Sequence, residues 1–185
     1  LSALDINQPV SVVGFSLDGY SAWQFAFPHQ TRLAALIQID TRAVADTPEA
    51  RARRLEMADE VLAAGNVEAA LAMTPKLLAP ETVQRRPEIV EQLEAMIRRQ
   101  SPEAISAAQR GMAARHDVSE QLAGISQPVL LLGGTHDAIS TPAEMQTIAD
   151  ALPSGRFVEI AEAGHMSPME NGDAVNDAIR EFLRG

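Results

Sequence analysis

The stretch of sequence that decides the fold is Val12–Tyr20, which reads VVGFSLDGY. An apolar run, Val10–Val13, predicts a buried strand that ends at Gly14, and the mostly apolar residues Tyr20–Phe27 predict a helix. Ser16 lies in the turn between them. A strand, a glycine, a serine and a helix in this order are typical of a nucleophile elbow, a sharp turn that lifts the serine hydroxyl above the end of a sheet.

This elbow departs from the usual pattern at Asp18. The motif has a second small residue two positions after the serine, where this chain has Asp18, and Gly19 follows one place later. We expect Asp18 to be too large for that slot, and its charge opposes an oxyanion that forms nearby. An ordinary strand-to-helix turn that contains a serine is therefore an open alternative for this stretch taken alone.

The composition indicates a globular protein and argues against several functions. The chain has 185 residues, enough for one domain with a core, and 46% of them are hydrophobic. Cysteine is absent, which excludes disulfides and thiolate metal sites. The net charge of −10 argues against nucleic acid and anionic membranes as partners. No apolar run approaches the ~20 residues of a membrane span, and we expect a cytoplasmic protein.

Four apolar runs predict the strands of one sheet. They are Val10–Val13, Arg32–Asp40, Gln127–Gly134 and Arg156–Ile160. The first two enclose a helix, so that they form a parallel strand–helix–strand unit. These patterns predict an α/β fold with a parallel sheet of about four strands that is flanked by helices.

The middle of the chain has a different pattern. Alanine, leucine and charged residues recur there at helical period and predict four helices: Glu49–Ala64, Val67–Leu78 before Pro80, Pro87–Gln100 and a helix capped by Ser101. We therefore expect residues 1–41 and 122–185 to form the sheet region and residues 42–121 to form a helical insertion. The methionines and leucines of this insertion line an apolar pocket or form packing core, and the sequence leaves both interpretations open.

Three stretches outside the insertion also carry helical patterns. Thr141–Leu152 begins with a capping box, in which Thr141 is the N-cap and Glu144 follows three residues later. Asp173–Leu183 is amphipathic, and Leu1–Asn7 has the pattern of the end of a helix.

Two residues have the right positions to activate Ser16. A serine hydroxyl is a poor nucleophile at neutral pH, so it needs a base and an acid that orients that base. In a parallel sheet such groups lie in loops at the carboxyl ends of strands. Asp137 follows the third predicted strand and His165 follows the fourth. Taken singly, Asp137 could cap a turn and His165 could be a solvated loop residue, but their joint placement favours a Ser-Asp-His triad.

The other histidines do not fit this arrangement. His29 lies at a helix end, His116 in the helical insertion and His136 directly beside the predicted acid. We expect them to be exposed or structural. No pair of histidines has the spacing of metal ligands on a helix, so we expect no metal site.

With these motifs, nearly the whole chain resembles the α/β-hydrolase fold family. The resemblance rests on Gly14–Tyr20, on Gly134–Asp137 with Pro142 after it, and on Gly164-His165 with Glu170 and Phe182-Leu183 after it. It implies a partial α/β-hydrolase fold in which residues 42–121 are a helical cap. It also implies a serine hydrolase, without a cofactor, that uses Ser16, Asp137 and His165. The serine at position 16 argues against a dehalogenase, because that branch has an aspartate there.

The helical part, with Gln109–Arg115, resembles the cap of small bacterial members that hydrolyse esters and lactones, and the chain is similar to enol-lactonase-like and cofactor-free haloperoxidase-like proteins. Family members have further strands before the elbow and an upstream His-Gly-x-x-Gly loop that donates an oxyanion N–H. Neither is in this sequence, which leaves the N–H of Leu17 as the oxyanion donor that can be named. We expect a truncated chain whose elbow strand is an uncovered sheet edge, open to self-association.

Two hypotheses for the function follow. The first is a hydrolase that cleaves an ester or lactone of a small molecule. The alternative is a catalytically impaired relative that acts as a binding module, which is motivated by Asp18 and by the missing oxyanion loop. The substrate depends on a pocket to which the sequence gives no guide.

Overall fold

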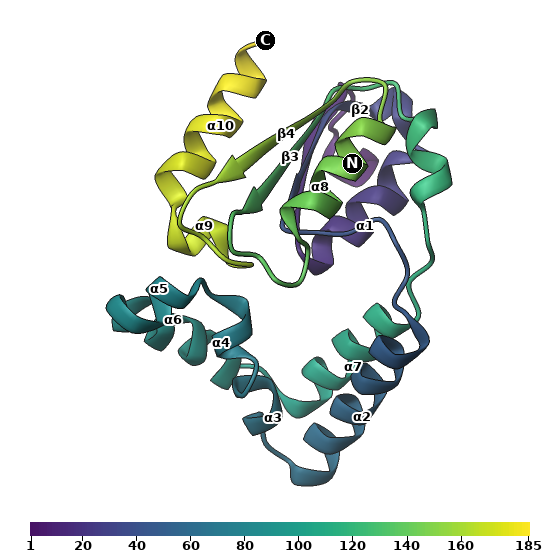
Figure 1. Ribbon diagram of the computed structural model, residues 1–185. Coiled ribbons are helices and arrows are strands. Elements are labelled where there is room, and N and C mark those ends of the chain that lie inside the picture. Colours follow the sequence, from purple (N-terminus) through teal and green to yellow (C-terminus); the bar gives the residue numbers. More distant parts are fainter.

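The computed structural model describes residues 1–185, apart from the side chain of Ser2. Four strands form one parallel sheet in the order β1-β2-β3-β4, as the sequence predicts (Figure 1). The strands are β1 (Val10–Phe15), β2 (Leu33–Ile39), β3 (Val129–Gly134) and β4 (Gly155–Ile160). The helices of the sheet region are α1 (Leu17–Ala26), α8 (Pro142–Ala151), α9 (Ser167–Glu170) and α10 (Gly172–Arg184).

The two central strands are buried on both faces because helices cover each face of the sheet (Figure 1). Side chains alternate between the faces of a strand. Leu36 and Leu131 accordingly belong to the core beneath α1 and α8. Ile37 and Leu130, each one residue away, belong to the core beneath α10. This double burial explains why β2 and β3 have nearly continuous apolar sequences rather than alternating ones.

The first strand, β1, lies at an edge of the sheet and pairs with β2. Val13 of this strand is 52% exposed, which is high for a large apolar side chain in a sheet. The elbow strand is thus an edge strand, as expected from the sequence.

A helical insertion separates β2 from β3, and it projects away from the sheet (Figure 1). Its helices are α2 (Pro48–Ala64), α3 (Glu68–Leu71), α4 (Thr74–Leu77), α5 (Pro80–Arg85), α6 (Pro87–Arg98) and α7 (Pro102–Ala113). The long helices α2 and α7 lie side by side (Figure 1). The 3₁₀ helix η3 (Ser119–Gly124) then leads back to β3.

The predicted bounds of some helices are wrong. The single helix expected over Val67–Leu78 is two short helices, α3 and α4, and Pro75 lies in the first turn of the second. Proline lacks an N–H and disfavours helical backbone at the residue before it, so the helix cannot run through. Pro80, which was expected only to follow the end of a helix, is the first residue of α5. Leu1–Asn7 contains a short 3₁₀ helix, η1 (Ser2–Leu4), instead of the end of an α-helix.

The predicted N-caps are confirmed. Ser101 accepts a hydrogen bond from the N–H of Ala104, and Thr141 accepts one from the N–H of Glu144. The carboxylate of Glu144 bonds to Arg42 of the segment after β2. In the described part of the chain, every helix is too short or too polar to cross a membrane.

Candidate active site

Ser16 occupies a strained turn between β1 and α1. Its φ of 48° and ψ of −111° are unusual for a residue other than glycine. Two groups at the end of β2 hold the turn: the carbonyl of Ile39 accepts the N–H of Ser16 at 2.9 Å, and the hydroxyl of Thr41 donates to the Ser16 carbonyl at 2.7 Å. Such strain persists only where the surrounding structure fixes it, and it is common at functional sites.

The tight packing of this turn falls on Gly14 and Gly19, not on Asp18. A Cβ atom on Gly14 would lie 2.6 Å from the Cα atom of Gly19, and one on Gly19 would lie 2.6 Å from the Cβ atom of Thr41. Asp18 is exposed to solvent. The expectation that Asp18 crowds the elbow is therefore wrong, because the position that admits no side chain is three residues after the serine instead of two.

The structure brings together the three residues predicted as a triad. Ser16 Oγ lies 2.8 Å from His165 Nε2, and His165 Nδ1 lies 2.9 Å from Asp137 Oδ2. His165 and Asp137 are buried, whereas Ser16 is partly exposed. The residues come from three loops at the carboxyl ends of β1, β3 and β4, so the parallel sheet is what places them side by side.

The carboxylate of Asp137 is fixed by its own loop. The N–H groups of Ile139 and Ser140 donate to Oδ1, and the hydroxyl of Ser140 donates to Oδ2. Burial alone would raise the pKa of Asp137, but the hydrogen bonds from His165 and Ser140 outweigh it and hold the pKa below its usual value. Asp137 is thus ionised at neutral pH and oriented toward the imidazole.

The N–H of Leu17 is in the first turn of α1, directly after Ser16. N–H groups in a first turn have no acceptor within their own helix, and the helix dipole makes this end partly positive. The position is therefore suited to hold a negatively charged oxygen next to the serine.

The histidine loop is attached to the helical insertion through Glu170, a buried residue of α9. One carboxylate oxygen accepts the N–H of Gly164 at 2.7 Å, and the other accepts the N–H of Ala79 at 2.7 Å. The N–H of Met166 also donates to the carbonyl of Leu77. Gly164 and Met166, the two neighbours of His165, are therefore both hydrogen-bonded where the histidine loop meets the insertion. Sequence reasoning included Glu170 only in the family resemblance and did not indicate this contact.

An apolar cluster fills the space between the histidine loop and the insertion. Leu78, Ile89 and Leu93 of the insertion pack against Met166, and Phe15 at the end of β1 packs against the same cluster. The ring centroid of Phe15 is 6.1 Å from that of His165. Of the two interpretations left open for the apolar residues of the insertion, packing core is the one that applies to Leu78.

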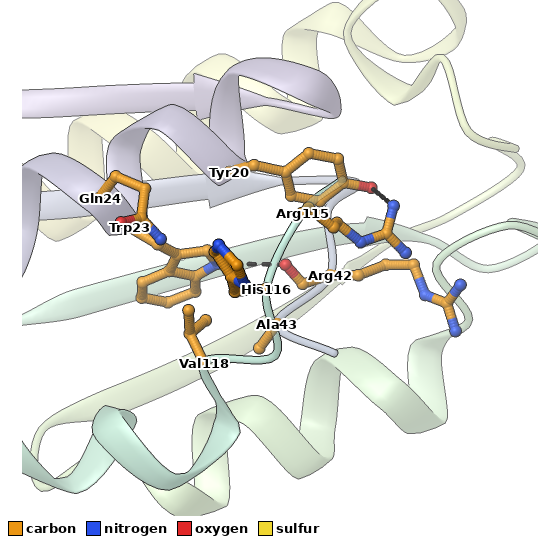
Figure 2. A pocket seen from close by; sticks show the side chains of 8 residues that line it. All are labelled: Tyr20, Trp23, Gln24, Arg42, Ala43, Arg115, His116 and Val118. Carbon is orange, nitrogen blue, oxygen red and sulfur yellow. Dashed lines mark hydrogen bonds between the residues drawn. The ribbon is translucent and has the colours of Figure 1, made fainter. Parts of the chain in front are cut away.

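A hollow of about 120 Å³ lies where the two connections of the insertion meet α1, and none of the three triad residues lines it (Figure 2). Tyr20, Trp23, Gln24, Arg42, Ala43, Arg115, His116 and Val118 line it. Figure 2 shows Arg115 bonded to the hydroxyl of Tyr20, at 3.1 Å. Arg115 also bonds to Asp46, and Arg42 bonds to Glu144. The arginines of this hollow are thus engaged in joining the insertion to the sheet region.

The remaining histidines, His29, His116 and His136, are all exposed, as predicted. Within the residues that the structure describes, no group of three or more His, Cys, Asp or Glu side chains could hold a metal ion. The spacing of Ser16, His165 and Asp137 is the geometry that a serine nucleophile, a histidine base and an orienting carboxylate require.

Comparison with known proteins agrees with this fold. The chain belongs to the alpha/beta hydrolase fold family, which it matches over residues 1–172. It is similar to a solved thermophilic esterase from Thermogutta terrifontis, with a TM-score of 0.93 and 41% identity over 99% of this chain and 67% of that one. It is also 27% identical to 3-oxoadipate enol-lactonase 2 of Acinetobacter baylyi, over 100% of this chain and 67% of that protein.

A shorter match links the chain to a protein named as the non-heme bromoperoxidase BpoC of Mycobacterium tuberculosis. It is 41% identical over 59 residues, which make up 32% of this chain and 22% of that protein. This chain thus spans about two thirds of the length of the esterase and the lactonase, and a smaller share of BpoC is matched.

Proposed function

We propose that this chain carries the active site of a serine hydrolase that cleaves a carboxylic ester or lactone of a small molecule. The observation that carries the proposal is the continuous hydrogen-bonded series from Ser16 through His165 to Asp137, with lengths of 2.8 and 2.9 Å. The esterase and enol-lactonase among its relatives support the substrate class. A cytoplasmic location and a small-molecule partner are parts of the same proposal.

In the proposed mechanism, Ser16 Oγ attacks the carbonyl carbon while its proton moves to His165 Nε2. Asp137 accepts the Nδ1–H of His165, which fixes the tautomer and stabilises the imidazolium. The N–H of Leu17 holds the oxyanion of the tetrahedral intermediate. When the intermediate collapses, the C–O bond to the leaving group breaks and His165 returns the proton to that oxygen. A water molecule, deprotonated by His165, then cleaves the acyl-serine ester.

The helical insertion has the role of a cap in this proposal. It is bonded to the histidine loop through Glu170 and packs against Phe15 beside Ser16. In this proposal the insertion forms one side of the substrate pocket, so its residues select the acyl or alcohol group of the substrate.

The proposal is tested by hydrolysis of short p-nitrophenyl esters with the parent chain, Ser16→Ala and Ser21→Ala. Ser21 is an exposed serine of α1, the helix that follows Ser16, so its substitution is the matched control. We expect Ser16→Ala to lower kcat at least about 10⁴-fold and Ser21→Ala to leave it unchanged. Equal rates for parent and Ser16→Ala would refute the proposal.

Labelling with a fluorophosphonate probe gives a second readout that does not need turnover. The probe should modify Ser16 of the parent, as located by peptide mass spectrometry, and should not modify Ser16→Ala. A folded parent that is neither labelled nor active would instead support the non-catalytic alternative.

A further inference from the structure

Asp40 is a buried carboxylate to which the proposed mechanism gives no role. It follows β2 directly, its exposed fraction is 0%, and β2 lies between β1 and β3. Its φ of 46° is in the left-handed region, which is uncommon for a residue with a side chain. A buried charge and a strained backbone both cost free energy, so their presence here needs a physical reason.

Asp40 joins the loops that carry the acid and the base. Its Oδ1 accepts the N–H of Gly134 at 3.0 Å, and Gly134 ends β3, at the start of the loop that holds Asp137. Its Oδ2 accepts the N–H of Ser167 at 3.1 Å and the hydroxyl of Ser167 at 2.6 Å. Ser167 lies two residues after His165, so one carboxylate is bonded to both loops.

The residues on either side of Asp40 hold the third loop. As described above, Ile39 accepts the N–H of Ser16 and Thr41 donates to its carbonyl. At the end of β2, Ile39 and Thr41 therefore fix the turn of Ser16. Asp40, which lies between them, fixes the loops of Asp137 and His165.

We propose that Asp40 is a positioning residue for the candidate triad, whose ionised carboxylate holds the loops of Asp137 and His165 at the spacing that the triad needs. This inference rests on the proposed function. The ionised form is the one that fits, because a carboxylate accepts all three hydrogen bonds. A protonated carboxyl must donate one bond, and the N–H groups of Gly134 and Ser167 cannot accept it. Protonation therefore leaves the Ser167 hydroxyl as the only acceptor, and that hydroxyl must turn.

The charge of Asp40 depends on pH in the neutral range. The titratable groups that face it are His165, from the loop after β4, and Asp137, from the loop after β3. Burial raises the pKa of Asp40 to about 7, although the hydrogen bond from Ser167 and the charge of His165 act to lower it. Activity should therefore require deprotonation of Asp40.

The test is the pH profile of kcat/KM for p-nitrophenyl acetate in the parent, Asp40→Asn and Ser167→Ala, with Asp150→Asn as the control. Asp150 is an exposed aspartate of α8. We expect Asp40→Asn to lower kcat about 10²-fold with little change in KM, because an amide cannot accept all three bonds and the loops shift. The slope of the acid limb of log(kcat/KM) should fall by about 1, since the ionisation of Asp40 is removed.

Ser167→Ala removes one of the three bonds and should cause a smaller loss of kcat in the same direction. The double variant should lose no more than Asp40→Asn alone, because both changes act through one contact. Asp150→Asn should reproduce the parent in both rate and slope.

The outcomes separate this inference from the function on which it rests. If Ser16→Ala is inactive while Asp40→Asn keeps the parent kcat and acid-limb slope, the positioning role is overturned and the hydrolase stands. If Ser16→Ala is as active as the parent, the hydrolase and the positioning role are both overturned. If Asp40→Asn does not fold, Ser167→Ala decides, and an unchanged kcat in that variant overturns the positioning role.

Discussion

The sheet region and the helical insertion hold their functional geometry in different ways. At the carboxyl edge of the sheet, the end of β2 holds Ser16, the loop after β3 holds Asp137, and Asp137 in turn holds His165. The insertion projects from this edge and is joined to it at a few points (Figure 1). The comparison teaches that the three side chains are held within one edge of the sheet, whereas the insertion reaches that edge through separate contacts, one of which lies beside His165.

Several contacts that attach the insertion to the sheet region are polar. Asp46, in the connection after β2, bonds to Arg54 of α2 at 2.6 Å and to Arg115 of the return connection at 2.7 Å. The N–H of Val118 bonds to the carbonyl of Ala43, which ties the two connections together. On the opposite side, Glu170 bonds to Ala79. Substitutions at Asp46 should therefore affect the attachment of the insertion more than the chemistry at Ser16.

The largest expected effect is on catalysis at the sheet edge. Asp137→Asn keeps the shape of the side chain but no longer favours the Nδ1–H tautomer of His165, so kcat should fall about 10⁴-fold. Ester hydrolysis at saturating substrate measures it. The matched control is Asp59→Asn, an exposed aspartate of α2 in the insertion, which should keep the parent kcat. Equal losses from the two changes would contradict the contrast between the regions.

The second effect is a pH dependence of stability that originates at Asp40. Burial raises the pKa of Asp40 from its ordinary value of 3.8 to about 7. Between these two pH values the folded state therefore holds a proton that the unfolded chain has released. The free energy of unfolding should therefore fall as pH rises from about 4 to 7, by up to about 4 kcal/mol, and then become level. Urea unfolding at a series of pH values measures this slope.

Asp40→Asn should remove that slope, and Asp150→Asn should keep it. Stability and activity then respond to pH in opposite directions, since the ionised carboxylate costs folding free energy and positions the loops. Identical slopes in the parent and in Asp40→Asn would show that Asp40 does not titrate in this window.

The third effect concerns the joint of the insertion. The Asp46 side chain is 1% exposed, and Asp46→Asn leaves Arg54 and Arg115 without their carboxylate. The loss of one partner from a buried ion pair should lower the free energy of unfolding by about 3 kcal/mol. Asp59→Asn, which removes an exposed pair with Arg110, should cost no more than about 1 kcal/mol. Urea unfolding of both variants tests this, and similar losses would count against a buried joint.

The smallest effect compares two neighbours in the elbow. Gly19→Ala places a methyl group against Thr41, so it should cost about 2 kcal/mol of stability and lower kcat by moving the Ser16 turn. Asp18→Ala removes a carboxylate one residue earlier, at an exposed position, and should change stability by no more than about 0.5 kcal/mol. Thermal unfolding of the two variants gives the comparison. A clear gain in stability from Asp18→Ala would restore Asp18 as the crowded position, because the smaller side chain would relieve the crowding.

Much of the fold and of the candidate site could be predicted from local patterns. The four strands follow from their apolar runs, and the caps at Ser101 and Thr141 follow from residue type and spacing. The break between α3 and α4 was missed because the apolar pattern continues across Pro75. The placement of Ser16, Asp137 and His165 could be predicted because every parallel strand ends at the same edge of the sheet.

The sequence by itself determined which segments become strands and helices, and which chemical groups follow the strands, because backbone periodicity and turn residues act over short distances. Only the tertiary structure decided that Asp40 bonds to Ser167, 127 residues away, that Glu170 bonds to Ala79, and that Gly19 rather than Asp18 is the crowded residue. The physical reason is that a polar side chain finds its partner according to how the folded loops pack around it. That packing is a property of the assembled sheet edge and not of any one stretch of the chain.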